Sequence, residues 1–161
     1  AAHYGFVNRL LLAELVRRRL RAIFGDLEMP LVYDLPHNIT LPVGEGFIAR
    51  KGACPAAAEQ PVIIPGSMGA PSFLMVGLGN PDWLSSASHG AGRSTRRGRM
   101  YGKDAAALGL NGVDCVARRP ERRVEEAPAA YKPILPVIDA QVAAGLVAPV
   151  ARLRPLLTFK A

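Results

Sequence analysis

Hydrophobic side chains recur at three- and four-residue spacing along the first part of the chain, over residues 4–24. This spacing is typical of one face of an α-helix. Arginines fall mostly between the apolar positions, where we expect a solvated face, and Gly25 follows as a residue suited to ending a helix. The pattern therefore predicts one helix over this range.

Beyond that helix, short apolar runs alternate with turn residues, which predicts strands. The expected strands are residues 31–34, 47–51, 62–64, 72–76, 113–116, 147–153 and 156–159, and the first two are expected to pair. Helical patterns cover residues 98–110 and 133–144, and Gly145 is expected to end the second. Because helices and strands mix without strict alternation, the sequence predicts an α+β fold rather than a doubly wound sheet.

The composition is that of a globular domain with a basic surface. Half of the 161 residues are apolar, enough for one core. Twenty Lys and Arg against 13 Asp and Glu leave a net charge of +7, which suits a polyanionic partner such as nucleic acid. Arginines that only solvate helix faces are the alternative explanation of this charge.

The two cysteines, Cys54 and Cys115, lie far apart and form neither a disulfide framework nor a zinc motif. A reducing compartment, the cytoplasm, is the expected location. No apolar run approaches the length of a membrane span, so no membrane partner is expected. The chain starts at Ala1, without Met and inside a helical pattern, and we expect an upstream portion of the protein to be missing.

Residues 85–93, a hydroxyl-rich stretch that runs into His-Gly-Ala-Gly-Arg, combine three features of phosphate chemistry. Gly90 and Gly92 allow backbone N–H groups to approach an anion closely. Arg93 can hold phosphate oxygens in a bidentate manner. A neutral His89 imidazole is a competent nucleophile for phosphorus, which suggests a covalent nucleotidyl-histidine. A surface loop with a solvated histidine is the alternative.

Two further polar loops follow expected strands, where functional residues concentrate. In the first, His37 could ligate a metal and Asn38 could bond to a phosphate or ribose oxygen. A hydrogen-bonded structural histidine is the alternative for His37. In the second, Ser67 could present its hydroxyl and N–H to a phosphate, or belong to a tight turn.

These motifs, in this order, resemble the RtcB family of RNA ligases, the tRNA-splicing ligases that join a 3′-phosphate end to a 5′-hydroxyl end. The resemblance runs almost end to end, and many ordered matches are more specific than any one motif. The matching segments are residues 2–9, 33–38, 50–53, 65–72, 86–93, 125–132, 152–155 and Lys160.

The resemblance implies a GTP-dependent reaction in which His89 attacks the α-phosphate and carries GMP as a phosphoramidate. GMP then passes to the RNA 3′-phosphate, and the 5′-hydroxyl of the second strand displaces it. Two manganese ions serve the family chemistry, and His37 is the one metal ligand that the resemblance assigns to this chain.

The resemblance also implies the residues that contact the nucleotide and the RNA. The nucleotide set is His37, Asn38, Pro65, Gly66, Ser67, Met68, Ser72, His89, Gly90, Ala91, Gly92, Tyr131 and Lys160, with the last two near the guanine. Arg93, Arg96 and Arg97 suit an RNA backbone, although a solvated loop is the alternative for the run that begins at Arg96.

By the same resemblance, residues 1–161 form the C-terminal portion of a single ligase domain. The family's remaining Asp, Cys and two His metal ligands belong to the N-terminal portion and are absent here. We therefore expect the isolated chain to be inactive or very weak. The alternatives are a non-catalytic basic fragment that binds RNA or another partner, and the product of a broken gene.

Overall fold

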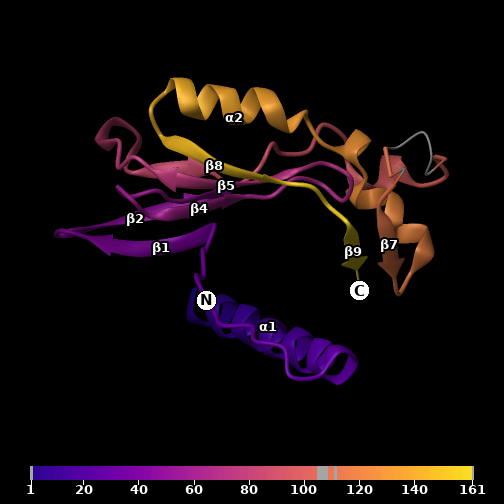
Figure 1. Ribbon diagram of the computed structural model, residues 1–161. Helices are drawn as coiled ribbons and strands as arrows, with labels where there is room; N and C mark the ends of the chain where they lie inside the picture. The colour runs from indigo at the N-terminus through magenta and orange to yellow at the C-terminus, as the bar shows by residue number, and fades with distance from the viewer. Residues whose placement is uncertain (1, 105–108, 111, 161) are drawn as a thin grey trace.

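An antiparallel sheet of three strands forms the centre of the molecule (Figure 1). The computed structural model describes residues 2–104, 109–110 and 112–160. The sheet has the order β4-β5-β8, with β4 at Pro61–Ile64, β5 at Ser72–Gly77 and β8 at Val147–Leu153. Every second side chain of β4 and β5 is buried, since alternate residues of a strand point to the same face.

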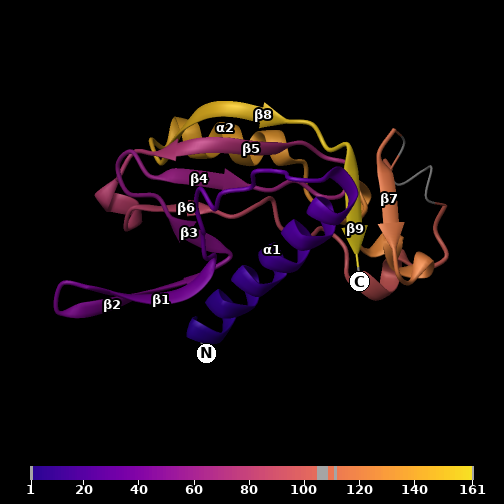
Figure 2. The ribbon, with the colours of Figure 1, turned by 60° about the horizontal axis from the view of Figure 1, so that its bottom comes forward.

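Helix α2, Ile134–Ala143, lies along one face of this sheet (Figures 1 and 2). Ile134 and Ile138 pack into the same core as Val62 and Met75 of the sheet. Gly145 adopts the left-handed conformation just after the helix, with φ of 64°, and the chain turns directly into β8. The helix predicted at residues 133–144 is confirmed, and so is its end.

Two short strand pairs bring together segments that are remote in sequence. Strand β3, Ala53–Pro55, pairs antiparallel with β6, Ser86–Ser88, and β7, Asp114–Ala117, pairs parallel with β9, Leu157–Lys160. The β3–β6 pair adds the fully buried Cys54 to the core. The sequence pattern does not predict β3 and β6, because three residues are too short for a visible alternation. The short 3₁₀ turns η1, η2, η4 and η5 cover Pro81–Trp83, Arg97–Met100, Pro120–Glu126 and Pro128–Ala130.

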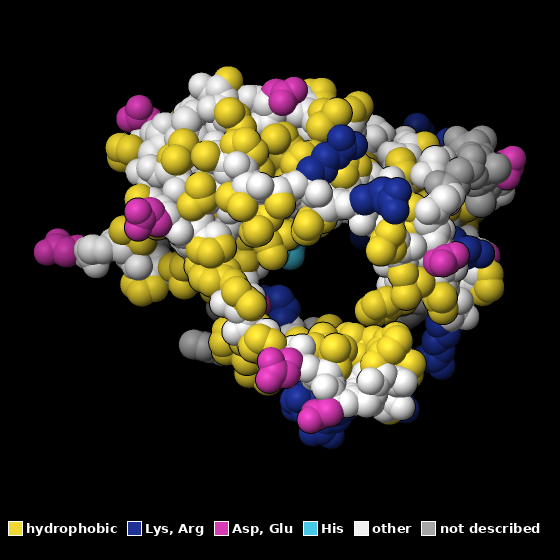
Figure 3. Space-filling view, viewed as in Figure 1, with side chains coloured by type: hydrophobic (Ala, Val, Ile, Leu, Met, Phe, Trp, Pro, Cys, Tyr) yellow, Lys and Arg dark blue, Asp and Glu magenta, His cyan; other side chains and the backbone are white. Residues whose placement is uncertain are grey.

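Helix α1, Ala2–Phe24, confirms the predicted first helix and lies on the opposite side of the sheet from α2 (Figure 1). Many of its apolar side chains are exposed. Arg9 holds the helix to the following segment by a bidentate ion pair with Asp34, with both N···O distances at 2.7 Å. The space-filling view shows the molecule hollowed between α1 and the sheet, with histidine atoms visible at the rim (Figure 3).

The strand predicted at residues 31–34 is wrong. These residues form no strand and pair with no strand among the described residues, and Asp34 bonds to Arg9 instead. The true partner of β2, Gly46–Lys51, is β1, Asn38–Val43. Gly44, with φ of 56°, allows the two-residue turn that joins them. Residues 36–38 therefore lead into a strand rather than out of one.

The helix predicted at residues 98–110 is wrong over its described part. One 3₁₀ turn, Arg97–Met100, ends before Gly102, whose φ of 74° does not fit a right-handed helix. Residues 105–108 lie outside the described residues. The other predicted strands are confirmed within one or two residues, and so is the α+β class. Within the described residues, no helix combines the length and apolar character needed to span a bilayer.

Candidate functional site

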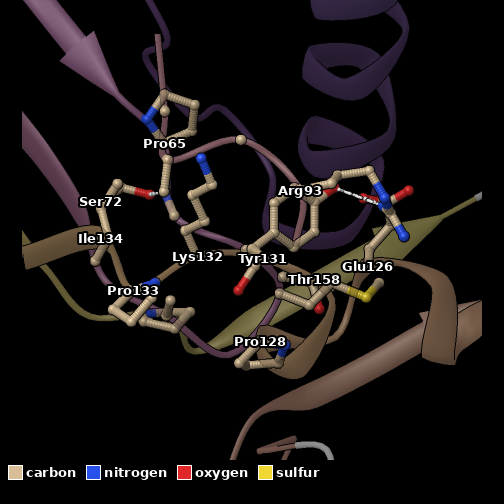
Figure 4. A pocket seen from close by; sticks show the side chains of 18 of the residues that line it. Pro65, Ser72, Arg93, Glu126, Pro128, Tyr131, Lys132, Pro133, Ile134 and Thr158 are labelled. Atoms are coloured by element: carbon tan, nitrogen blue, oxygen red, sulfur yellow. Dashed lines mark hydrogen bonds and ion pairs between the residues drawn. The ribbon is translucent and has the colours of Figure 1, made fainter. Parts of the chain in front are cut away.

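A pocket of about 1180 Å³ lies where four segments of the chain meet (Figure 4). Its walls are the loop after β4, the loop after β6, the segment 126–134 and strand β9. All of the nucleotide-contact residues expected from the sequence line it, except His37, Asn38 and Lys160. The side chain of Lys160 lies outside the described residues.

Two glycine-containing loops form the floor of the pocket. Gly90 and Gly92 have φ values of 123° and 73°, a region that favours glycine, so the loop after β6 can turn its backbone toward the pocket. In the loop after β4, a Cβ at Gly66 would lie 2.3 Å from the carbonyl oxygen of Pro71, and only glycine fits. Ser72 closes this turn, since its hydroxyl accepts from the N–H of Gly66 at 3.1 Å.

His89 reaches the pocket as a neutral imidazole. Burial, with a smaller contribution from neighbouring His37, lowers its pKa from 6.5 to about 4, although a hydrogen bond with the Ile63 backbone raises it. The ring of His37 stacks on that of His89, with centroids 4.1 Å apart and planes 8° from parallel. At neutral pH the ring therefore keeps the lone pair that a nucleophile requires.

The loop that leads into β1 packs beside the pocket rather than lining it. His37 stands behind His89, against its ring face. The Asn38 side-chain oxygen accepts from the N–H of Gly52 at 2.9 Å and so links β1 to the turn before β3. The structure thus places His37 against His89, the candidate nucleophile, and uses the side chain of Asn38 for a hydrogen bond within the fold.

Buried polar atoms that lack a hydrogen-bond partner gather at this pocket. Among the described residues they are the hydroxyl oxygens of Ser67 and Thr158, Nδ1 of His89 and Nη2 of Arg93, and all four residues line the pocket. An unpaired buried polar atom is costly, about 1–3 kcal/mol, and is generally satisfied by water, an ion or a ligand. Their convergence indicates a site built for a polar ligand.

Arg93 belongs to the pocket wall rather than to the outer surface (Figure 4). Its Nη1 donates to the Tyr131 hydroxyl at 3.1 Å and lies 3.4 Å from a Glu126 carboxylate oxygen. The guanidinium also stacks over the Tyr131 ring, 4.9 Å from its centroid. Tyr131 donates to Glu126, and burial together with this bond raises the pKa of the phenol.

The other two expected RNA-contact residues are exposed beside the pocket. Arg96 and Arg97 border a shallow depression of about 400 Å³, together with Arg93, Ser94 and Thr95. Arg97 also lies 3.5 Å from Glu126. This basic edge is therefore continuous with the wall of the main pocket.

One wall of the pocket carries the polar groups described above, and the other wall is apolar. Proline and aliphatic groups form the second wall: Pro128, Pro133, Ile134, Pro155, Leu157 and Phe159. Sequence reasoning missed Glu126, Lys132 and Thr158 as pocket residues. Glu126 and Lys132 fall in a stretch that resembles the family, whereas no local pattern marks Thr158. A mostly apolar wall opposite a few polar groups is typical of sites for organic ligands such as nucleotides.

The donor set of the described residues does not fit a manganese site. No group of three or more His, Cys, Asp or Glu side chains within the described parts of the chain could hold a metal ion. His37 and His89 supply only imidazoles, whereas manganese favours several oxygen ligands.

Comparison with known proteins agrees with the resemblance seen in the sequence. The family model described as tRNA-splicing ligase RtcB matches residues 1–161. The chain is 38% identical to the RNA-splicing ligase RtcB of Mycobacterium tuberculosis, over 97% of this chain and 42% of the relative. It is 37% identical to the Escherichia coli RNA-splicing ligase RtcB2, over 99% of this chain and 44% of the relative.

The tRNA-splicing ligase RtcB of Methanopyrus kandleri is 33% identical over 97% of this chain and 20% of its own length. The chain thus spans less than half the length of these relatives. The match nevertheless covers nearly all of the chain, including both loops that form the pocket floor. The chain belongs to the RtcB family of RNA ligases.

Proposed function

We propose that this chain forms the part of a GTP-dependent RNA ligase that binds the nucleotide and carries GMP on His89. The observation that supports this most is the neutral, partly buried imidazole in a pocket that gathers four unpartnered polar atoms. Backbone N–H groups of residues 90–92 and the Arg93 guanidinium suit the phosphates. The apolar wall with Tyr131 suits the guanine.

In the proposed reaction, an imidazole nitrogen of His89 attacks the α-phosphorus of GTP. A P–N bond forms, the bond to the bridging oxygen breaks, and pyrophosphate leaves with the electron pair. The RNA 3′-phosphate oxygen then takes GMP from His89, which returns to the neutral imidazole. Attack by the 5′-hydroxyl of the second RNA end forms the phosphodiester, releases GMP and gives up one proton.

Manganese remains an expectation of the family. His37 is the one ligand proposed here, and its ring stacks on that of His89, which supports a place near the proposed nucleophile. We propose that the other ligands come from the portion of the ligase that corresponds to the rest of the relatives' length. This chain would then be the C-terminal portion of one catalytic domain.

RNA with 3′-phosphate and 5′-hydroxyl ends is the proposed substrate, and the exposed Arg96 and Arg97 would guide its backbone to the pocket. The proposed location is the reducing cytoplasm, in keeping with two free cysteines.

A chimera tests this function. The matching part of the Mycobacterium tuberculosis relative is replaced by these 161 residues, and GMP labelling and RNA joining are measured with labelled GTP and manganese. We expect acid-labile label and ligation, and a loss of at least 1000-fold for both with His89→Ala. An active His89→Ala chimera would rule out His89 as the GMP carrier. The isolated chain is expected to bind GTP without acquiring label, and label on His89 would contradict its proposed inactivity.

A further inference from the structure

Helix α2 holds the peptide that presents His89 through one buried side chain, Gln141. We infer that Gln141 is a positioning residue for the His89 loop. The inference takes from the proposed function only the role of His89, because the contact itself stands on the geometry of α2 and β6.

Gln141 and Glu125 are the buried polar or charged residues among those described. Gln141 is 5% exposed and lies on the face of α2 that carries Ile134 and Ile138 into the core. An aliphatic side chain would fill this position without the cost of burying an amide. Retaining a glutamine therefore requires a hydrogen bond that compensates for its burial.

That hydrogen bond ends on the residue before the nucleophile. The side-chain oxygen of Gln141 accepts from the N–H of Ser88 at 2.7 Å, and its amide nitrogen donates to the carbonyl of Val137 at 3.3 Å. Among the hydrogen bonds described, the first is the one that ties α2 to β6. This hydrogen bond therefore links the helix to the last residue of β6, directly before His89.

Strand geometry explains why a side chain is needed there. Ser88 ends β6, whose strand partner is β3, and the N–H of His89 donates to the carbonyl of Gly52 on that side at 3.0 Å. Successive N–H groups of a strand point to opposite sides, so the N–H of Ser88 faces away from β3. Gln141 provides the acceptor on this second side.

The two consecutive amides at His89 are therefore held from opposite directions. The Ser88 hydroxyl also donates to the carbonyl of Gly90 at 2.8 Å, which fixes the turn just after the histidine. Since displacing a reacting group by about 1 Å can slow a reaction about 100-fold, this double anchor bears directly on the reactivity of His89.

Amide hydrogen exchange of the 161-residue chain tests the anchor without any reaction. Gln141→Met keeps the length and shape of the side chain and removes the acceptor. Ile138→Ala is the control, because it weakens the same helix and core and leaves the hydrogen bond between Gln141 and Ser88 in place. We expect exchange of the Ser88 and His89 amides to speed up at least tenfold in Gln141→Met beyond the change in Ile138→Ala. Equal protection of these amides in both variants, after correction for global stability, would overturn the inference. If Gln141→Met does not fold, Gln141→Asn is used in its place. The shorter side chain of this variant moves the amide oxygen away from the N–H of Ser88 by one methylene.

The GMP-transfer rate in the chimera separates positioning from general stability. Gln141→Met is expected to lower the rate of His89 labelling about 10- to 100-fold, with the half-saturating GTP concentration changed less than threefold. Gln141→Glu, which keeps an acceptor oxygen, is expected to recover most of the rate. A Gln141→Met chimera that labels as fast as the Ile138→Ala chimera contradicts the inference. If the unmutated chimera takes no label, the proposed function fails, and hydrogen exchange alone decides the role of Gln141.

Discussion

His89 and Arg93 contribute differently to the charge of the pocket: the imidazole is neutral, and the guanidinium is paired with a carboxylate. Burial keeps His89 uncharged at neutral pH and in mild acid, because desolvation lowers its pKa to about 4. Arg93 lies against the Glu126 carboxylate, and its Nη2 has no hydrogen-bond partner among the described residues. The pocket is therefore less positive than its arginine suggests, because Glu126 offsets part of the attraction for an anion.

Replacing Glu126 by Gln should tighten the binding of phosphate-containing ligands. A unit charge about 7 Å from the ligand, at an effective dielectric constant of about 40, is worth about 1 kcal/mol, or roughly fivefold in affinity. Calorimetry with pyrophosphate and with GTP measures the change in the dissociation constant. Glu45→Gln, in the exposed β1–β2 turn, removes the same charge away from the pocket and should have no effect. Weaker binding in Glu126→Gln would mean that its hold on Arg93 matters more than its charge.

The sequence predicts the parts of the site that are local and misses those made by distant contacts. The loop of residues 88–93 is recognisable because its glycines, histidine and arginine are neighbours in the chain. Glu126 and Thr158 reach the same pocket through η4 and the parallel β7–β9 pair, and no short pattern marks Thr158. His37 is assigned to the site by family resemblance, but its stacking on His89 is visible only in the structure.

Helices and strands differ in how far the sequence determines them. Helix α1 is predicted because its apolar spacing is long and regular, although much of its apolar side is exposed. The run at residues 31–34 resembles a strand in composition, but a strand needs a partner, and the tight turn at Gly44 gives β2 another one. Such competition between segments is not visible in a local pattern.

The Arg9–Asp34 ion pair is expected to fasten α1 to the rest of the molecule. Arg9 lowers the pKa of Asp34, so the pair stabilises the fold fully above about pH 4 and loses this effect as pH falls through the lower pKa. Asp34→Asn should therefore speed amide exchange in α1 severalfold at pH 6 and lower global stability by about 1 kcal/mol or less. Glu14→Gln, which removes ion pairs within α1, is the control and should leave the docking of α1 unchanged. If α1 exchanges equally in both variants, the ion pair is not the fastening contact.

At the scale of the whole molecule, Lys and Arg side chains lie on both sides of the hollow, some of them on α1 (Figure 3). The net charge of +7 favours RNA, and the exposed Arg96 and Arg97 connect this charge to the wall around Arg93. A basic fragment that binds RNA without catalysing a reaction would have the same net positive charge. The proposed ligase role, unlike RNA binding alone, requires the neutral His89 in the pocket.

The salt dependence of RNA binding distinguishes contacts of the RNA backbone with particular arginines from attraction by the net charge of the protein. The isolated chain should bind single-stranded RNA with an affinity that falls steeply as salt rises, and His89→Ala should leave this binding unchanged. Replacing Arg96 and Arg97 by Ala should lower the slope of log affinity against log salt by about 1.4, as expected for two lost phosphate contacts at about 0.7 each. The matched control replaces the exposed Arg118 and Arg119, which removes the same charge away from the pocket lining. Fluorescence anisotropy at several salt concentrations gives the slopes. Equal slopes for the two double variants would show that net charge, rather than the edge of the pocket, binds the RNA.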